Sequence, residues 1–347
     1  MTGNERIAAF VQLGHFLEHF AVEKDWQGYE DGVSKAEHDD FNKAIMSVQH
    51  HNGWFTPEMV RKAFAGISKW LKADVLSNWL AKYPGTEKNK TIAVIMAGNI
   101  PLVGFHDVLC VLLSGNKLMA KFSGDDDVLM PLLLKYLVQV EPGFNDYIRI
   151  SNNQLANFNA VIATGSNNSA RYFEAYFGKY PHIIRKNRTS VAVIQGNESA
   201  AALKALGHDV FDYYGLGCRN VTKIYVPKGY NLDHFFGAIF DFKDIVHHKK
   251  YANNYDYHKA IYLMNGDKLV ENGFLLLKED KSFFSPVGVL HYEYYDDLHA
   301  VEKELAENRD ALQCVVDNKN ILFGQTQQPK IDDYADGVDT MQWIQGL

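Results

Sequence analysis

Cys218 stands at the end of a short glycine-rich stretch, YYGLGCRN, and is the side chain best placed to do chemistry. Gly215 and Gly217 bracket a turn there, and glycine permits a positive φ and a close approach of the backbone to a ligand. Arg219 follows directly, and a neighbouring guanidinium favours the thiolate, which is the nucleophilic form of cysteine. The pattern therefore fits a covalent nucleophile, although a free cysteine at an arbitrary position is more often a small buried apolar residue.

The chain has three cysteines, and the other two lie in apolar surroundings. Cys110 in DVLCVLL and Cys314 in DALQCVV are both expected to be buried. An odd number of cysteines without a CxxC pair excludes a disulfide framework and a thiolate-rich structural zinc site. The pair His247-His248 has no acidic or cysteine partner at metal-ligand spacing, so it is expected to lie on a solvated basic face.

Two further turns carry polar residues between an apolar run and a helix-like segment. Asn99 follows TIAVIMAG, where its amide can donate to an oxyanion or can instead cap the next helix. Gly165 and Ser166 follow NAVIAT, where the N–H groups of a helix start form an anion site suited to a pyrophosphate, although no full GxGxxG is present. Lys121 ends the strand-like KLMAKFS and either reaches a ribose or phosphate or is a solvated surface charge.

The elements that must position these residues alternate between strand and helix after residue 90, which predicts a parallel doubly wound sheet. Residues 1–90 are expected to be helical, with a polar loop at DWQGYEDGVSKAEHDD and one long helix starting at Thr56-Pro57. A second α/β domain follows, in which AALKALGHDVFDYYG is predicted to be helical and HYEYYDD alternates like an edge strand. The expected domains are 1–188 and 189–347, the second including the C-terminal tail.

Composition narrows the class of protein. The 347 residues are 47% hydrophobic and 22% charged, with 35 basic and 42 acidic side chains, which excludes disordered and fibrous classes. A net charge of −7 provides no field for nucleic acid, so no such partner is expected. No apolar run approaches the roughly 20 residues of a membrane span, and MTGNERIAAFVQLG does not have the pattern of a secretion signal. We therefore expect a soluble, cytoplasmic protein.

The order of the motifs is more specific than any one of them. A strand ending in Asn-x-Pro, then Gly-Asn, Lys-x-Ser, a Thr-Gly-Ser turn and a Gly-x-Gly-Cys loop resembles the aldehyde dehydrogenase superfamily. The sequence resembles the LuxC-type long-chain acyl-CoA reductase family more closely. The similarity lies in AGNIPLVGFHDVLCVLLSGNKLMAKFS, ATGSNNSARYFEAYFGK, YYGLGCRNVTKIYVP and FGQTQQPKIDDYADGVDTMQWI, and covers roughly residues 90–347.

This resemblance implies two doubly wound α/β domains with a helical N-terminal region, and an activity: NADPH-dependent reduction of a long-chain fatty acyl-CoA to the aldehyde through an acyl-cysteine thioester. It implies Cys218 as the acyl acceptor and Asn99 as the oxyanion donor. The cofactor contacts that it implies are Lys121, Ser123, Gly165 and Ser166. By the same analogy, a homo-oligomer and an acyl-supplying partner enzyme are expected.

Three departures from the superfamily pattern bear on the chemistry. IIRKNRTS lacks the glutamate that activates water in hydrolytic aldehyde dehydrogenases, which favours transfer to a thiol. Ser282 replaces the glutamate that holds the nicotinamide ribose. Gly124 stands where users of NAD often have glutamate, which favours NADPH, but Asp125 follows it and NADH stays open. Acyl-phosphate reduction, aldehyde oxidation and a non-catalytic scaffold remain as alternative functions.

Overall fold

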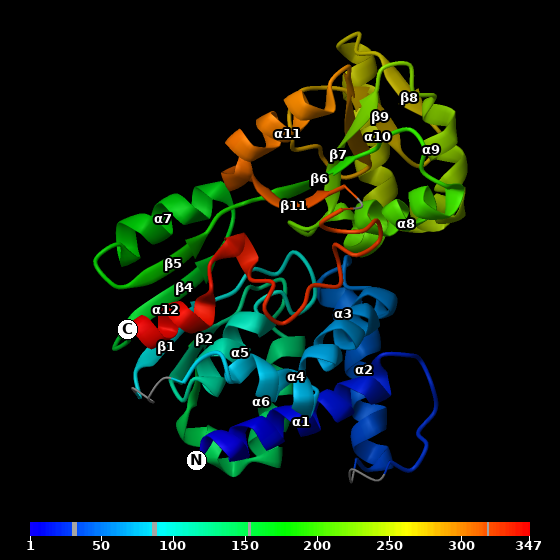
Figure 1. Cartoon of the computed structure of the whole chain (residues 1–347). Coiled ribbons are helices and arrows are strands. Elements are labelled where there is room, and N and C mark those ends of the chain that lie inside the picture. Colours follow the sequence, from blue (N-terminus) through cyan, green and yellow to red (C-terminus); the bar gives the residue numbers. More distant parts are fainter. Residues whose placement is uncertain (30–32, 85–88, 152–153, 318) are drawn as a thin grey trace. The chain divides into compact units, whose positions relative to one another are not determined.

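The structure is a computed structural model that describes residues 1–29, 33–84, 89–151, 154–317 and 319–347. It divides into two compact units (Figure 1). Unit 1 comprises Met1–Lys186 and Lys330–Leu347, and unit 2 comprises Asn187–Pro329. This differs from the expected division at residue 188, because the C-terminal residues belong with the N-terminal part of the chain.

Unit 1 begins with four helices: α1 (Gly3–Phe20), α2 (Lys35–His51), α3 (Pro57–Trp70) and α4 (Ala73–Leu80). α1 packs on α3 and bears a buried apolar face that includes Phe10 and Leu17. One long helix was expected to start at Thr56-Pro57, and α3 does begin at Pro57. It ends at Trp70, however, and a second helix, α4, follows it. The helical N-terminal region is thus confirmed.

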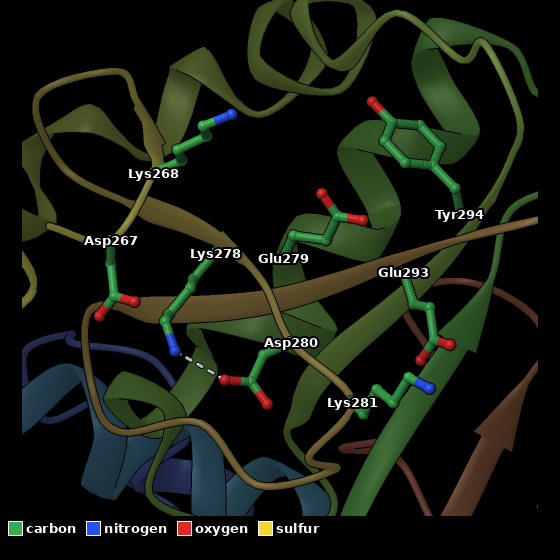
Figure 2. A pocket seen from close by; sticks show the side chains of 8 residues that line it. All are labelled: Asp267, Lys268, Lys278, Glu279, Asp280, Lys281, Glu293 and Tyr294. Carbon is green, nitrogen blue, oxygen red and sulfur yellow. Dashed lines mark hydrogen bonds and ion pairs between the residues drawn. The ribbon is translucent and has the colours of Figure 1, made fainter.

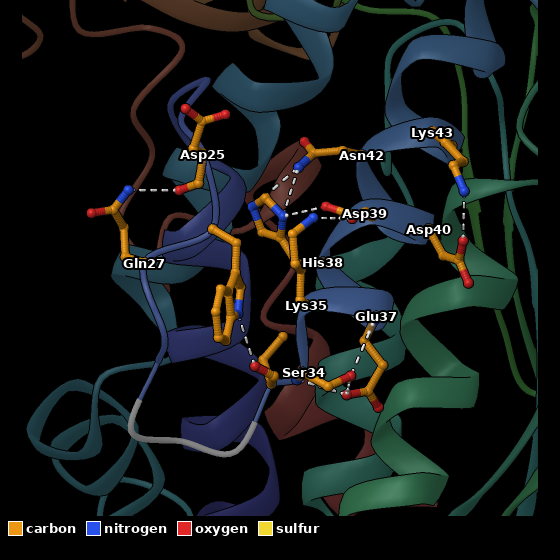
Figure 3. A network of polar contacts seen from close by, with 12 residues as sticks. Asp25, Gln27, Ser34, Lys35, Glu37, His38, Asp39, Asp40, Asn42 and Lys43 are labelled. Atoms are coloured by element: carbon orange, nitrogen blue, oxygen red, sulfur yellow. Dashed lines mark hydrogen bonds and ion pairs between the residues drawn. The ribbon is translucent and has the colours of Figure 1, made fainter.

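The polar stretch 25–40 was expected to be a loop, but its last part is helical, because α2 begins at Lys35. Residues 30–32 of this stretch lie outside the described residues. Ser34 and Glu37 form a reciprocal capping box: Ser34 Oγ accepts from the N–H of Glu37, and the Glu37 carboxylate accepts from the N–H of Ser34 at 2.9 Å (Figure 3). Ser-x-x-Glu is a helix-start signal that the sequence contained.

The first sheet has the order β3-β2-β1-β4-β5, and every strand pair in it is parallel. Its strands are β1 (Thr91–Ile95), β2 (Lys117–Lys121), β3 (Ile148–Ile150), β4 (Ala160–Thr164) and β5 (His182–Arg185). The helices that follow these strands are α5 (Phe105–Leu113), α6 (Leu129–Val140) and α7 (Asn167–Phe177), with a short 3-10 turn at Pro142–Asp146. This is the predicted doubly wound arrangement, and the fold class is confirmed.

Buried polar contacts explain why the C-terminal segment belongs to unit 1. Arg185 donates to Asp107 at 2.7 Å, to the Thr340 hydroxyl at 3.0 Å and to the Ala335 carbonyl at 2.9 Å. α12 (Thr340–Gly346) packs on α5. The sequence could not place this segment, because its partners lie more than a hundred residues away along the chain.

The sheet of unit 2 has the order β11-β6-β7-β10-β9-β8. Its strands are β6 (Thr189–Val193), β7 (Val221–Pro227), β8 (Leu269–Glu271), β9 (Leu276–Glu279), β10 (Val289–Tyr295) and β11 (Leu312–Val316). β8 pairs antiparallel with β9, and the other pairs are parallel. HYEYYDD was expected to form an edge strand, but most of it lies in β10, which is hydrogen-bonded on both sides by β7 and β9.

The helices of unit 2 are α8 (Ala200–Phe211), α9 (Leu232–Ala238), α10 (Lys249–Met264) and α11 (Leu298–Glu307). α8 was expected to continue to Gly215, but it ends at Phe211 because the backbone turns left-handed shortly afterwards. Cys314 in β11 and Cys110 in α5 are buried, as predicted. Within the described part of the chain, no helix has the length and apolar character needed to cross a membrane.

Candidate active site

Cys218 lies in the turn that leads into β7 and is partly buried. The turn is held on both sides of the cysteine. Ser190 in β6 donates from its Oγ to the Cys218 carbonyl at 3.0 Å, and the Asn220 N–H donates to the Gly217 carbonyl at 3.0 Å. The backbone around the thiol is thereby fixed to the sheet of unit 2.

The residues before this turn have a strained backbone. Tyr213, Tyr214 and Gly215 all have left-handed conformations, with φ of 53°, 58° and 78°. A non-glycine residue in this region costs about 1–2 kcal/mol, and such strain concentrates at functional sites. The sequence predicted a positive φ near the cysteine, and Gly215 has it. The two tyrosines were missed, because no sequence signal marks a left-handed tyrosine.

Arg219 was expected to favour the thiolate of Cys218, and the structure shows a contact of its guanidinium with another cysteine. Its Nη1 donates to Cys314 Sγ at 3.4 Å. The Cys314 N–H in turn donates to Ser190 Oγ at 3.1 Å. Cys314 is therefore buried, as predicted, but it lies in the same cluster as the Cys218 turn.

His248 is a residue whose position the sequence did not predict. Its ring stacks on Tyr214, with centroids 4.2 Å apart, and its Nδ1 accepts from the N–H of Tyr251 at the start of α10. The expectation of a solvated face holds for His247, whose side chain is 80% exposed, but not for the partly buried His248. Among the described residues, no group of three or more His, Cys, Asp or Glu side chains is arranged to hold a metal ion.

A small cavity of about 20 Å³ lies beside the left-handed residues that precede Cys218. Its lining includes Tyr214, Gly215, Thr222, Tyr251 and Pro286. This volume accommodates about one water molecule. A long acyl chain does not fit there without movement of these side chains.

In unit 1, the candidate residues gather at one edge of the sheet. β2, β1 and β4 are parallel neighbours, so their carboxyl ends lie side by side. Asn99 follows β1, and Lys121 is the last residue of β2, with its carbonyl accepting from the N–H of Met96 at 3.0 Å. The other candidates at this edge are Ser123 after β2, and Gly165 and Ser166 after β4. This is the edge at which open parallel sheets bind ligands.

Asn99 is exposed in the loop between β1 and α5. Its alternative role as a helix cap is wrong, because Gly104 is the N-cap of α5. Asn52 at the end of α2 supports the loop: its Nδ2 donates to the carbonyls of Gly98 and Asp125, both at 3.3 Å. The sequence did not identify Asn52 as part of this edge, since it lies on a helix that precedes the sheet.

Asp126 is a second residue that the sequence missed. It is 5% exposed, and its Oδ2 accepts from the N–H of Leu102 at 2.8 Å. Leu102 has a left-handed φ of 58°. Burial raises the pKa of Asp126 to about 7, against the lowering effect of the Leu102 N–H. The loop that carries Asn99 is therefore fixed by a carboxyl group that titrates near neutrality.

The turn after β4 leads directly into the start of α7. Ser166 is the N-cap of α7, and its Oγ accepts from the N–H of Ser169 at 3.2 Å. A Cβ on Gly165 would lie 2.8 Å from Ser169 Cβ and 3.0 Å from Phe173 Cε2, so only glycine fits. A Cβ on Gly124, by contrast, would have no atom within 4 Å. These residues fit a nicotinamide dinucleotide, whose pyrophosphate suits a helix N-terminus.

The segment around Ser282 is held by polar side chains of β7. Lys223 is fully buried, and its Nζ donates to the Lys281 carbonyl at 2.9 Å and pairs with Glu293 at 2.6 Å. Thr222 Oγ1 donates to the carbonyl of Phe283 at 2.5 Å. Nothing in the sequence singled out Lys223, because a lysine in a strand is ordinarily solvated.

A wide groove of about 640 Å³ lies elsewhere on unit 2 (Figure 2). Its lining carries both signs of charge, and Lys278 and Asp280 form an ion pair there at 2.7 Å. None of the residues predicted for the site lines it; the lining is Asp267, Lys268, Lys278, Glu279, Asp280, Lys281, Glu293 and Tyr294.

Solved structures of aldehyde dehydrogenases are similar to this chain. The enzyme KauB from Pseudomonas aeruginosa is 11% identical, with a TM-score of 0.64 over 92% of this chain and 77% of that one. The NAD-dependent aldehyde dehydrogenase from Sinorhizobium meliloti is 12% identical, with a TM-score of 0.63 over 94% of this chain and 72% of that one. A Mycobacterium tuberculosis aldehyde dehydrogenase complexed with NAD+ is 14% identical, with a TM-score of 0.58 over 87% of this chain and 70% of that one. These likenesses show the fold.

A search of curated proteins found no sequence that matches this chain. Among protein families, residues 67–235 match the acyl-CoA reductase (LuxC) family. Family and fold together indicate an oxidoreductase that acts on acyl-CoA or aldehyde. The match over residues 67–235, on a fold shared with aldehyde dehydrogenases, confirms the resemblance to the LuxC acyl-CoA reductase family that the sequence indicated.

Proposed function

We propose that the protein is an NADPH-dependent acyl-CoA reductase that converts a long-chain fatty acyl-CoA into the aldehyde through an acyl-cysteine thioester. One observation carries the proposal: the family match over residues 67–235 includes every candidate residue. These residues are Asn99, Lys121, Ser123, Gly165, Ser166 and Cys218. The strained backbone before Cys218 supports its role as the nucleophile.

In the proposed first half-reaction, the Cys218 thiolate attacks the thioester carbonyl of acyl-CoA. The bond between that carbonyl and the CoA sulfur breaks, CoA leaves as the thiolate, and the acyl group is held on Cys218 as a new thioester. The Asn99 amide and the Cys218 N–H donate to the oxyanion. Loss of one such donor typically costs about 10²–10³ in rate.

In the second half-reaction, a nicotinamide cofactor, when bound, supplies a hydride to the acyl carbon. Lys121 and Ser123 would hold its ribose or phosphate, and the turn of Gly165 and Ser166 would hold its pyrophosphate. The oxyanion on the acyl-cysteine then collapses. The bond to Cys218 Sγ breaks, the aldehyde leaves, and the thiolate is regenerated, while the CoA thiolate released earlier takes up a proton.

Transfer to a thiol is favoured over hydrolysis by the segment IIRKNRTS, which contains no acidic side chain to activate water. Its arginines have structural partners: Arg185 pairs with Asp107 at 2.7 Å, and Arg188 donates to the Leu312 carbonyl at 3.1 Å. The open space at Gly124 supports NADPH, because a carboxylate there would oppose a 2′-phosphate.

Intact-mass spectrometry after incubation with acyl-CoA tests the proposal. The wild type gains the mass of one acyl group, and Cys218→Ser gains none. Cys110→Ser and Cys314→Ser serve as matched controls and stay competent, because both cysteines are buried structural residues. Acyl label on the Cys218→Ser protein, or none on the wild type, contradicts the mechanism.

Aldehyde oxidation is a second candidate, favoured by the fold that the chain shares with NAD-dependent aldehyde dehydrogenases. Steady-state assays that compare acyl-CoA, acyl phosphate and aldehyde plus NAD(P)+ separate these reactions. A non-catalytic scaffold would show no preferential, CoA-protectable alkylation of Cys218 by iodoacetamide. The proposal also includes a homo-oligomer and an acyl-supplying partner enzyme; sedimentation measures the first and co-purification the second.

A further inference from the structure

We propose that Asn220 is a positioning residue that holds the Cys218 turn in the conformation required for acyl transfer. The inference rests on the proposed function, since it takes Cys218 as the reacting group. Asn220 lies two residues after Cys218, and it is 0% exposed. A buried amide must satisfy its donors and its acceptor within the protein, and these partners reveal its role.

The donor side of Asn220 binds the end of α8. Its Nδ2 lies 3.1 Å from the Asp209 carbonyl oxygen, 3.4 Å from that of Val210 and 2.8 Å from that of Asp212. The last carbonyls of a helix have no partner within the helix. Asn220 supplies the donor that these buried groups need, so it attaches the end of α8 to the start of β7.

The acceptor side of Asn220 binds the cysteine turn itself. Oδ1 accepts from the N–H of Gly217 at 2.8 Å, and the Asn220 N–H donates to the Gly217 carbonyl at 3.0 Å. One side chain therefore closes the loop that runs from α8 to the turn. The left-handed residues Tyr213 and Tyr214 lie within this loop, and their strain persists only where such contacts over-determine the backbone.

Hydrogen bonds from another segment of the chain hold the end of α8 in place. The Asp209 carboxylate accepts from the N–H of Gly324 at 2.6 Å, and from the N–H and hydroxyl of Thr326 at 3.0 and 2.8 Å. Asp209 is 0% exposed. The Cys218 N–H is the proposed oxyanion donor, so a small rotation of the turn would misalign it, and a displacement of about 1 Å can cost about 10²-fold in rate.

The test compares two reagents on Asn220→Ala. Acyl-CoA needs an aligned thiolate and oxyanion donor, whereas iodoacetamide needs only an accessible thiolate. We expect the rate constant of acylation to fall about 10- to 100-fold, with less than about a twofold change in the half-saturating acyl-CoA concentration. Alkylation of Cys218 should change by less than about threefold, because the thiol remains present and accessible.

Asn231→Ala is the matched control. Asn231 caps α9 in the same unit by accepting from the N–H of Asp233, so its loss lowers stability without touching the cysteine turn. If Asn220→Ala is insoluble, Asn220→Ser carries the same comparison, since its hydroxyl keeps one donor. An unchanged acylation rate, an equal fall with both reagents, or an equal fall in Asn231→Ala overturns the inference. A wild type that acyl-CoA does not label at Cys218 overturns the proposed function, and this inference with it.

Discussion

The hydroxyl of Ser190 donates a hydrogen bond to the carbonyl oxygen of Cys218 at 3.0 Å. Ser190 Oγ also accepts from the N–H of Cys314 at 3.1 Å. Ser190 is 0% exposed and lies in β6, between β7 and β11. A single hydroxyl therefore connects the proposed nucleophile to the strand at the edge of the sheet.

Ser190→Ala should lower the free energy of unfolding by about 1–3 kcal/mol, because it removes a buried hydroxyl that makes one hydrogen bond to Cys218 and one to Cys314. Urea unfolding monitored by circular dichroism measures the loss. Acylation of Cys218 should also slow. Ser199→Ala, which removes the N-cap of α8, is the control that loses about 1 kcal/mol of stability but keeps the contacts of the turn. Equal acylation in Ser190→Ala and the wild type would refute this role of Ser190.

Gly124→Glu should shift cofactor preference from NADPH towards NADH. The new side chain meets no atom within 4 Å of its Cβ, so the fold tolerates it, and its carboxylate repels a 2′-phosphate. The Kd of NADPH should rise about tenfold or more relative to that of NADH, because two like charges about 4 Å apart near a protein surface repel by up to about 4 kcal/mol and about 1.4 kcal/mol is a factor of ten in Kd. Fluorescence titration measures both constants, and Gly124→Ala controls for loss of the glycine. A ratio that does not change would show that the 2′-phosphate lies elsewhere.

Asp126 should make stability depend on pH. Its folded-state pKa of about 7 lies above the unfolded value, so the folded state binds the proton more tightly. The contribution of Asp126 to the free energy of unfolding is fully present below the unfolded pKa, and it is lost as the pH rises towards and through about 7. Asp126→Asn should therefore be more stable than the wild type at pH 8, by roughly 1–4 kcal/mol, and differ little at pH 4. Urea unfolding at both pH values checks this; an equal difference at both would contradict it.

Lys223→Met should destabilise unit 2 by about 1–3 kcal/mol, since it removes a charged hydrogen-bond donor from Glu293, whose side chain is 26% exposed. The double variant Lys223→Met/Glu293→Gln should recover part of the loss. Urea unfolding of both variants gives the coupling between the two side chains. Lys228→Met is the control, because its pair with Asp296 is 74% exposed on both sides and surface pairs contribute little. No recovery in the double variant would show that packing, not charge, sets the cost.

Much of the fold could be predicted from local sequence. TIAVI and AVIAT are short apolar runs bounded by turn residues, and they form β1 and β4 as expected. Gly115 follows α5 with a φ of 78°, and a glycine in this conformation is typical of a helix end. The first turns of α2 were missed although Ser34 and Glu37 signalled them. The strand β10 was wrongly predicted to lie at the edge of its sheet. Alternation of apolar and polar residues indicates which face of a strand is buried, but it does not indicate which strands are its neighbours.

By itself, the sequence determined the alternation of strands and helices, the burial of Cys110 and Cys314, and the order of motifs that indicates an acyl-CoA reductase. These depend on residue type and near neighbours, which are local properties of the chain. Only the tertiary structure decided what surrounds Cys218. Ser190 and His248 act through contacts with residues about thirty positions away in the sequence. Asn220 acts through contacts that need the chain to turn back after α8, where two tyrosines have a left-handed backbone. Such contacts are set by packing, and no pattern of neighbouring residues encodes them.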